Sequence, residues 1–89
     1  MTREPLQRAS DILQEASEAA SGEAADRLED QASAFATHAE SERGPDHGRL
    51  ARHENHLHEL ADDVDDAVGE LIEDAFDAIH DYRETIEGV

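Results

Sequence analysis

The sequence contains no cysteine and no lysine, and each absence excludes a class of structure. Without cysteine the chain forms neither disulfides nor thiolate metal sites. Without lysine, its seven basic residues are all arginines, and they face 24 acidic residues, for a formal net charge of -17. No clustered basic surface is available to hold phosphate backbones. We therefore expect neither nucleic-acid binding nor attachment to an anionic membrane.

Long apolar runs are absent as well. No segment approaches the roughly 20 apolar residues that a membrane-spanning helix needs, and residues 1–15 lack the apolar segment of a secretory signal. We therefore expect a cytoplasmic protein. Leu, Ile, Val and Phe together are scarce, which at this net charge is also typical of disordered chains, so periodicity has to decide between order and disorder.

The surplus of carboxylates without lysine is typical of the salty cytoplasm of an extreme halophile. Surface carboxylates hold hydrated cations, whereas the alkyl stem of lysine adds apolar surface that molar salt penalises. Local ion pairs, such as Arg83 with nearby Asp81, are expected to contribute under roughly 1 kcal/mol each. This composition indicates an environment and no activity.

Apolar periodicity favours helices over disorder. The second half carries a heptad-like seam, which includes Leu50, Leu57, Leu60, Val64, Ala67, Leu71 and Ala78. Beyond Val64 a second apolar track drifts round the helix, as a local insertion in the repeat would make it. The first half carries a weaker seam with spacings of three and four: Leu6, Ala9, Leu13, Ala16, Ala20, Ala24, Leu28, Ala32, Phe35 and Ala39.

The strongest helix-breaking signal is the segment 42–47. Gly44 suits the left-handed position that ends a helix, Pro45 does not continue one, and Asp46 is a good cap for the next. The sequence therefore predicts one all-α domain over residues 1–89. It consists of a helix over about 4–42, a turn at 43–46 and a helix over about 47–87, which form an antiparallel hairpin of two long helices.

Ser21-Gly22 is a possible second break, because glycine costs about 1 kcal/mol against alanine inside a helix and serine is a good cap. The apolar phase nevertheless runs through Ala16, Ala20, Ala24 and Leu28 without a jump. Folding the chain about 44–45 pairs residues whose numbers sum to about 91, so that the irregular stretches of the two halves coincide. This coincidence favours two continuous helices.

A hairpin of this length would be about 60 Å long and too thin to bury all its apolar side chains. Four of them would stay partly uncovered: Ile12, Ile72, Phe76 and Ile86. Association into a four-helix bundle covers such a stripe. We therefore expect a homodimer.

Six histidines in 89 residues suggest the sharpest site hypothesis. His53 and His56 stand three apart on one helix, and the hairpin pairing places His38 close to His53. These three residues are candidate metal ligands, and no other cofactor is indicated. The alternative is that the histidines make structural polar contacts or are solvated, as polar residues around a turn commonly are.

Two further patterns approximate known sites. Asp77-Ala-Ile-His80 resembles the Glu-x-x-His motif of di-iron bundles, but aspartate replaces glutamate and no second copy occurs. The acidic run 62–66 lacks the glycine and glutamate positions of a calcium loop, so we expect a solvated helix face. A slim hairpin has no desolvated cleft to shift a carboxylate pKa, so we expect no enzymatic activity.

The segment Gly44 to Leu60, GPDHGRLARHENHLHEL, resembles a family of short, acidic, functionally uncharacterised proteins from haloarchaea. The resemblance implies a haloarchaeal source and a helical fold, and it brings no activity, cofactor or binding residue. The sequence as a whole indicates a non-enzymatic oligomerisation or protein-interaction module. The alternative is a small metal-binding protein that uses the histidines near the turn.

Overall fold

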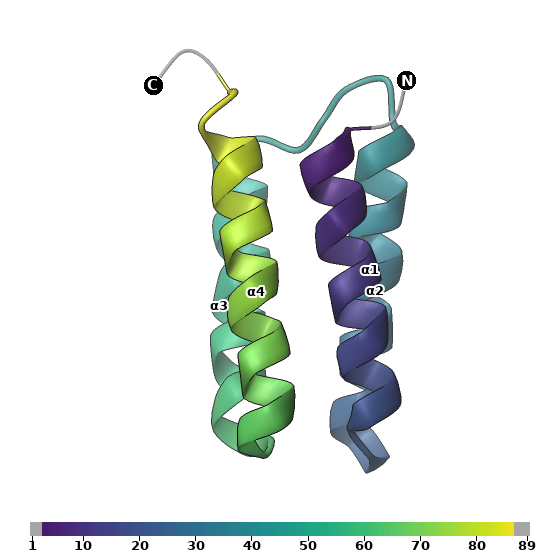
Figure 1. Ribbon diagram of the computed structural model, residues 1–89. Helices are drawn as coiled ribbons and strands as arrows, with labels where there is room; N and C mark the ends of the chain where they lie inside the picture. The colour runs from purple at the N-terminus through teal and green to yellow at the C-terminus, as the bar shows by residue number, and fades with distance from the viewer. Residues whose placement is uncertain (1–2, 87–89) are drawn as a thin grey trace.

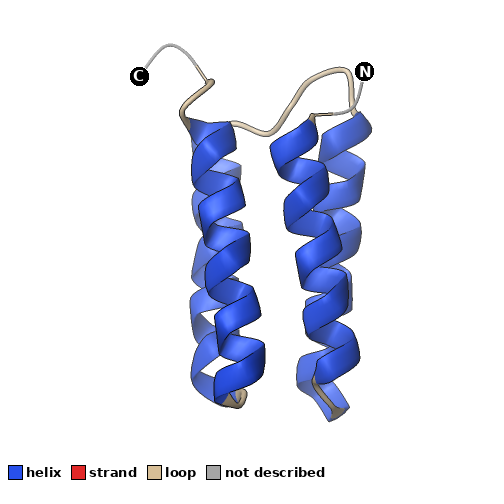
Figure 2. Ribbon diagram, in the orientation of Figure 1, coloured by secondary structure: helices blue, strands red, loops and turns tan. Residues whose placement is uncertain are grey.

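The computed structural model describes residues 3–86, which form four α-helices and no strand (Figures 1 and 2). The helices are α1 (Glu4–Ala19), α2 (Gly22–Glu40), α3 (His47–Asp63) and α4 (Asp66–Arg83). Successive helices run in opposite directions, so the α2–α3 connection lies at the same end as the start of α1 and the end of α4 (Figure 1). The all-helical prediction is confirmed. The two-helix hairpin is wrong, because each predicted long helix is broken in the middle.

The first break separates α1 from α2. Ala20 and Ser21 have extended backbones, with ψ of -179° and 163°, and Gly22 has φ of +63°. Only glycine adopts this left-handed conformation without a Cβ clash. The apolar phase misleads here because Ala20 and Ala24 lie on either side of the turn and both pack, half-buried, against the core.

The second break, which the sequence analysis missed, separates α3 from α4. Val64 is extended, and the side chain of Asp65 caps α4 by accepting a hydrogen bond from the Val68 amide at 3.0 Å. The apolar drift beyond Val64 therefore marks a turn and no insertion in a continuous helix. The two breaks lie at the same end of the bundle, where Ser21 and Val64 line one surface depression. Their proximity is why the irregular stretches of the two halves coincide in the sequence.

The connection at 41–46 is the turn that the sequence predicts. Asp46 caps α3 as expected, since its carboxylate accepts a hydrogen bond from the Arg49 amide at 2.8 Å. Gly44, however, is not left-handed, because Gly22 has the only positive φ within residues 3–86. A Cβ at Gly44 would overlap the Tyr82 hydroxyl and lie 2.8 Å from Nε of Arg3. A larger residue at position 44 would therefore require the side chains of Tyr82 and Arg3 to move, because the loop packs against the start of α1 and the end of α4.

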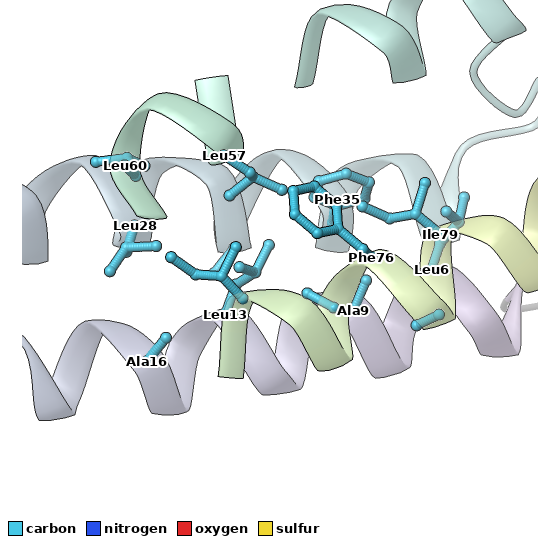
Figure 3. Close-up of a cluster of buried hydrophobic side chains, with 14 of the residues drawn as sticks. Leu6, Ala9, Leu13, Ala16, Leu28, Phe35, Leu57, Leu60, Phe76 and Ile79 are labelled. Atoms are coloured by element: carbon cyan, nitrogen blue, oxygen red, sulfur yellow. The ribbon is translucent and has the colours of Figure 1, made fainter. Parts of the chain in front are cut away.

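Each helix contributes one apolar stripe to a single core (Figure 3). Ten of the buried side chains in this view are labelled: Leu6, Ala9, Leu13, Ala16, Leu28, Phe35, Leu57, Leu60, Phe76 and Ile79. The hydroxyl of Ser10, which is also buried, donates to the Ala32 carbonyl at 2.7 Å and so satisfies its polar atom. Ile72 and Phe76, which the hairpin would leave partly uncovered, are buried within one chain. The hairpins from which the dimeric bundle would be built are therefore absent from residues 3–86, and Ile12 and Ile86 remain partly buried, so homodimerisation stays a prediction.

Helix α1 approaches α2 and α4 more closely than α3 approaches its two neighbours. Small buried residues in α1 and α4, such as Ala9, Ala16, Ala75 and Ala78, permit this close packing. Helix α3 buries Leu50, Leu57 and Leu60, whose larger side chains keep the helix axes apart. The resulting molecule measures 37 × 23 × 16 Å. Within the described residues, no helix is both long enough and apolar enough to cross a membrane.

Candidate functional site

Two histidines that the sequence predicts to be neighbours meet between α2 and α3. The Nε2 atoms of His38 and His53 lie 3.2 Å apart, and their rings are arranged edge to face. Nδ1 of His53 lies 2.8 Å from Oε1 of Gln31, a carbonyl oxygen that only accepts hydrogen bonds. His53 therefore carries its proton on Nδ1. In the neutral pair His38 then donates from its own Nε2 to the free Nε2 of His53.

The helical spacing of α2 creates this arrangement. Gln31, Phe35 and His38 are separated by four and three residues, so they share one face of the helix. Phe35 is fully buried, and its ring centre lies 4.9 Å from that of His53 and 6.2 Å from that of His38. The ring of Phe35 therefore packs against both imidazoles and shields one side of the pair from water.

Burial and nearby positive charge keep both imidazoles neutral at pH 7. Burial, followed by repulsion from the protonatable rings of His38 and His56 and from the guanidinium groups of Arg49 and Arg52, lowers the pKa of His53 to about 4. The pKa of His38 is lowered by burial and then by Arg49. The two permanently charged groups that lower these pKa values, Arg49 and Arg52, are both cations. This is unusual in a chain with 24 acidic residues and seven basic ones.

The three candidate metal ligands do not come together as one group. The structure joins His38 to His53, but His56 is exposed, and residues 3–86 contain no cluster of three or more histidine or carboxylate side chains able to hold a metal ion. Structural zinc sites use four protein ligands and catalytic ones three, so a pair falls short of either. The contact between the two rings is accounted for by an inter-imidazole hydrogen bond.

His47, which is partly buried, and His58, which is exposed, make structural contacts between α3 and α4. Nε of Arg83 donates to Nδ1 of His47 at 3.1 Å, and its guanidinium also pairs with Glu54. The Nε2 atom of His47 is buried and has no hydrogen-bond partner within the described part of the chain. The ring of His58 stacks on Phe76 at a centroid distance of 4.4 Å.

Ion pairs across helices are what the sequence analysis missed. The sequence suggests a local pair between Asp81 and Arg83, but Asp81 instead accepts from Arg8 of α1 at 2.6 Å. Arg83 turns inward to Glu54, whose side chain is only 14% exposed. No local spacing rule connects these partners, because the rotation of neighbouring helices sets their contacts.

An open depression of about 460 Å³ adjoins the histidine pair at the α2–α3 connection. Its lining residues are His38, Arg43, Gly44, Pro45, Asp46 and Arg49. The depression therefore presents two guanidinium groups and one imidazole edge, together with the carboxylate that caps α3.

The charge of the bundle is unevenly distributed along its length. If each helix is divided at its midpoint, the half that holds the two breaks (residues 12–30 and 56–74) carries one arginine against fourteen acidic residues. The half that holds the α2–α3 connection (residues 3–11, 31–55 and 75–86) carries six arginines against nine. Within residues 3–86 every carboxylate is exposed except that of Glu54.

A model of a family of unknown function (DUF7553) matches residues 1–85, a span that includes all four helices. The chain belongs to this family. No curated protein and no solved structure matches it.

In this DUF7553 member the two other candidate motifs have ordinary structural settings. The acidic run 62–66 spans the end of α3, the break and the start of α4, so the predicted solvated helix face is interrupted by a turn. Asp77 and His80 are both exposed on α4 and point away from the core that a di-iron site would require. The arginine and histidine surface at the α2–α3 connection is therefore the candidate functional site.

Proposed function

We propose that this DUF7553 member is a non-enzymatic protein-interaction module from the cytoplasm of an extreme halophile. The single observation that carries the proposal is the segregation of its basic side chains in one half of the bundle. Arg43, Arg49 and Arg52 are exposed there, and no carboxylate of residues 3–86 lies within ion-pair distance of them. These guanidinium groups can therefore bind a partner without breaking an ion pair within the bundle.

The partner expected from this surface is an acidic protein. A halophile cytoplasm is rich in acidic surfaces, and guanidinium groups form planar, bidentate pairs with carboxylates. Molar salt shortens the Debye length to about 3 Å, so the overall charge of -17 no longer repels such a partner while direct contacts persist. The exposed carboxylates elsewhere on the bundle act to keep the module soluble.

Affinity capture in 2 to 3 M KCl tests the proposal with a matched pair of variants. The double variant Arg49→Gln/Arg52→Gln should lose the proteins that the parent retains, as identified by mass spectrometry. Arg27→Gln removes the one arginine of the acidic half and should retain them. If both variants retain the same proteins, the basic surface is not the docking site.

Self-association is a separate outcome of the same design. Light scattering of the purified parent in 2 to 3 M KCl shows whether the partner is a second copy. A parent dimer that dissociates in the double variant and persists in Arg27→Gln would identify homodimerisation through this surface. A monomer in all three samples leaves a different acidic protein as the partner to be found by capture.

A further inference from the structure

The depression at the α2–α3 connection has the charge and shape of an anion site. Within residues 3–86 only Arg8 and Arg83 lie within 4.0 Å of a carboxylate, so the two guanidinium groups that line the depression, Arg43 and Arg49, have no ion-pair partner. The chain has more than three acidic residues for each arginine. Two unpaired guanidinium groups on one concave surface therefore stand out from the rest of the molecule.

The helix terminus itself does not account for this site. The first-turn amide of Arg49 is already occupied by the carboxylate of Asp46, which also lines the depression and opposes an incoming anion. Attraction has to come from the side chains of Arg43 and Arg49, and from His38 when it is protonated. The volume of about 460 Å³ lies in the range of small-molecule sites.

The hydrogen-bond relay leaves one ring nitrogen of His38 free to gain a proton. Gln31 fixes the proton of His53 on Nδ1, and His38 donates from Nε2 to His53, so Nδ1 of His38 carries a lone pair. Protonation at Nδ1 of His38 breaks neither hydrogen bond of the relay. It adds a donor and a positive charge to a side chain that lines the depression.

We infer that this depression binds a phosphate group, held by Arg43 and Arg49 and by a His38 that gains a proton as the ligand binds. Charge matching favours a dianion over a single carboxylate, because two guanidinium groups and an imidazolium together carry three positive charges. Arginine forks also match phosphate oxygens bidentately. The ligand is an inorganic phosphate or a small phosphate monoester. The inference does not depend on the proposed protein partner.

Anion binding and protonation of His38 favour each other. In the free protein the positive charge of Arg49 disfavours the imidazolium form of His38. The ring of His53 lies 3.2 Å away, and the basic groups of His56, Arg49 and Arg52 act on it in turn. A bound dianion offsets these charges and favours the imidazolium. Affinity for an anion whose own charge is constant therefore rises as the pH falls from 7.5 towards 6.

Amide chemical shifts in ¹⁵N-labelled protein test the site, with potassium gluconate holding the ionic strength at 1 M. Titration with inorganic phosphate should give saturable shifts confined to residues around 38–49. Arg43→Gln and Arg49→Gln should each weaken binding about two- to fivefold, the range for exposed charge contacts. Asp46→Asn keeps the helix cap and removes the opposing charge, so it should tighten binding by a similar factor. Arg27→Gln should leave the affinity unchanged.

Sulfate and glycerol phosphate complete the experiment. Sulfate stays dianionic from pH 7.5 to 6, so its affinity should rise over this range in the parent and stay level in His38→Gln. Glycerol phosphate binding more tightly than inorganic phosphate would identify a monoester as the ligand, and weaker binding would identify the free ion. Unsaturable shifts, or equal phosphate affinity in the parent and both arginine variants, would overturn the inference. The exposure of Arg43 and Arg49 keeps these variants folded, which circular dichroism verifies.

Discussion

Replacing two glycines by alanine should change stability in opposite directions. Gly22 begins α2 with φ of +63°, whereas Gly69 lies inside α4 with ordinary helical geometry. An added Cβ meets no atom within 4 Å at either position. Packing therefore contributes nothing to the comparison, and the backbone conformation alone decides the sign.

The magnitudes follow from the two conformations. A left-handed backbone costs an L-residue roughly 1–2 kcal/mol, and the reduced freedom of the unfolded chain offsets about 0.5 kcal/mol of this. Gly22→Ala should therefore destabilise the bundle by about 1 kcal/mol. Gly69→Ala should stabilise it by roughly 0.5–1 kcal/mol, the usual gain in a helix interior.

Urea denaturation in 2 M KCl, followed by circular dichroism at 222 nm, measures both changes under one condition. In a separate thermal melt, the midpoints of the two variants should move in opposite directions from that of the parent, by about 4–8 °C per kcal/mol for a domain of this size. A Gly22→Ala variant stabilised as much as Gly69→Ala would refute the reasoning. That result would mean that a continuous helix passes through residue 22.

Three more predictions follow. Gly44→Ala should cost about 1 kcal/mol, because its Cβ would displace the Tyr82 side chain from its preferred position, and Tyr82→Phe in that background should recover part of the loss; an unchanged urea midpoint would contradict the close packing. The pKa of His53 is about 4 in the folded chain and 6.5 in the unfolded chain, so between pH 7 and 5 it takes up its proton mainly in the unfolded chain and its contribution to stability falls. The urea midpoint of His53→Gln should therefore fall less over this pH range than that of the parent. Because its carboxylates are almost all exposed, the bundle should gain helical circular dichroism from 50 mM to 3 M KCl, and a constant signal would show that charge repulsion is unimportant.

The neighbours across the α2–α3 connection could be predicted from the sequence although the hairpin is wrong. Both breaks are at similar distances along the chain from that connection, so the long hairpin is in effect folded in half. His38 still meets His53, and Arg8 of α1 still meets Asp81 of α4, at residue numbers that sum to about 90. Bending the long hairpin at its two breaks keeps the antiparallel neighbours of the hairpin in contact. It adds new helix neighbours on the remaining faces.

The breaks themselves are hard to predict because their local signals are weak. Gly22 disfavours a continuous helix by only about 1 kcal/mol, whereas the burial of four apolar stripes in one core stabilises the broken helices by far more. Asp65 carries a cap signal, but the surrounding aspartates are equally typical of a solvated helix. The relay through Gln31 and the pair between Arg83 and Glu54 depend on helix rotation and on rotamers, which periodicity does not specify.

The most direct test of the single-chain bundle is the distance between the ends of the first two helices. The chain has no cysteine, so Glu4→Cys/Glu40→Cys places spin labels at two exposed positions only. The Arg3 amide donates to the Ala39 carbonyl at 3.0 Å, so pulsed electron resonance should give a label separation within about 20 Å, given axes about 8–10 Å apart. A separation near 54 Å, the length of 36 residues of continuous helix, would contradict the bundle.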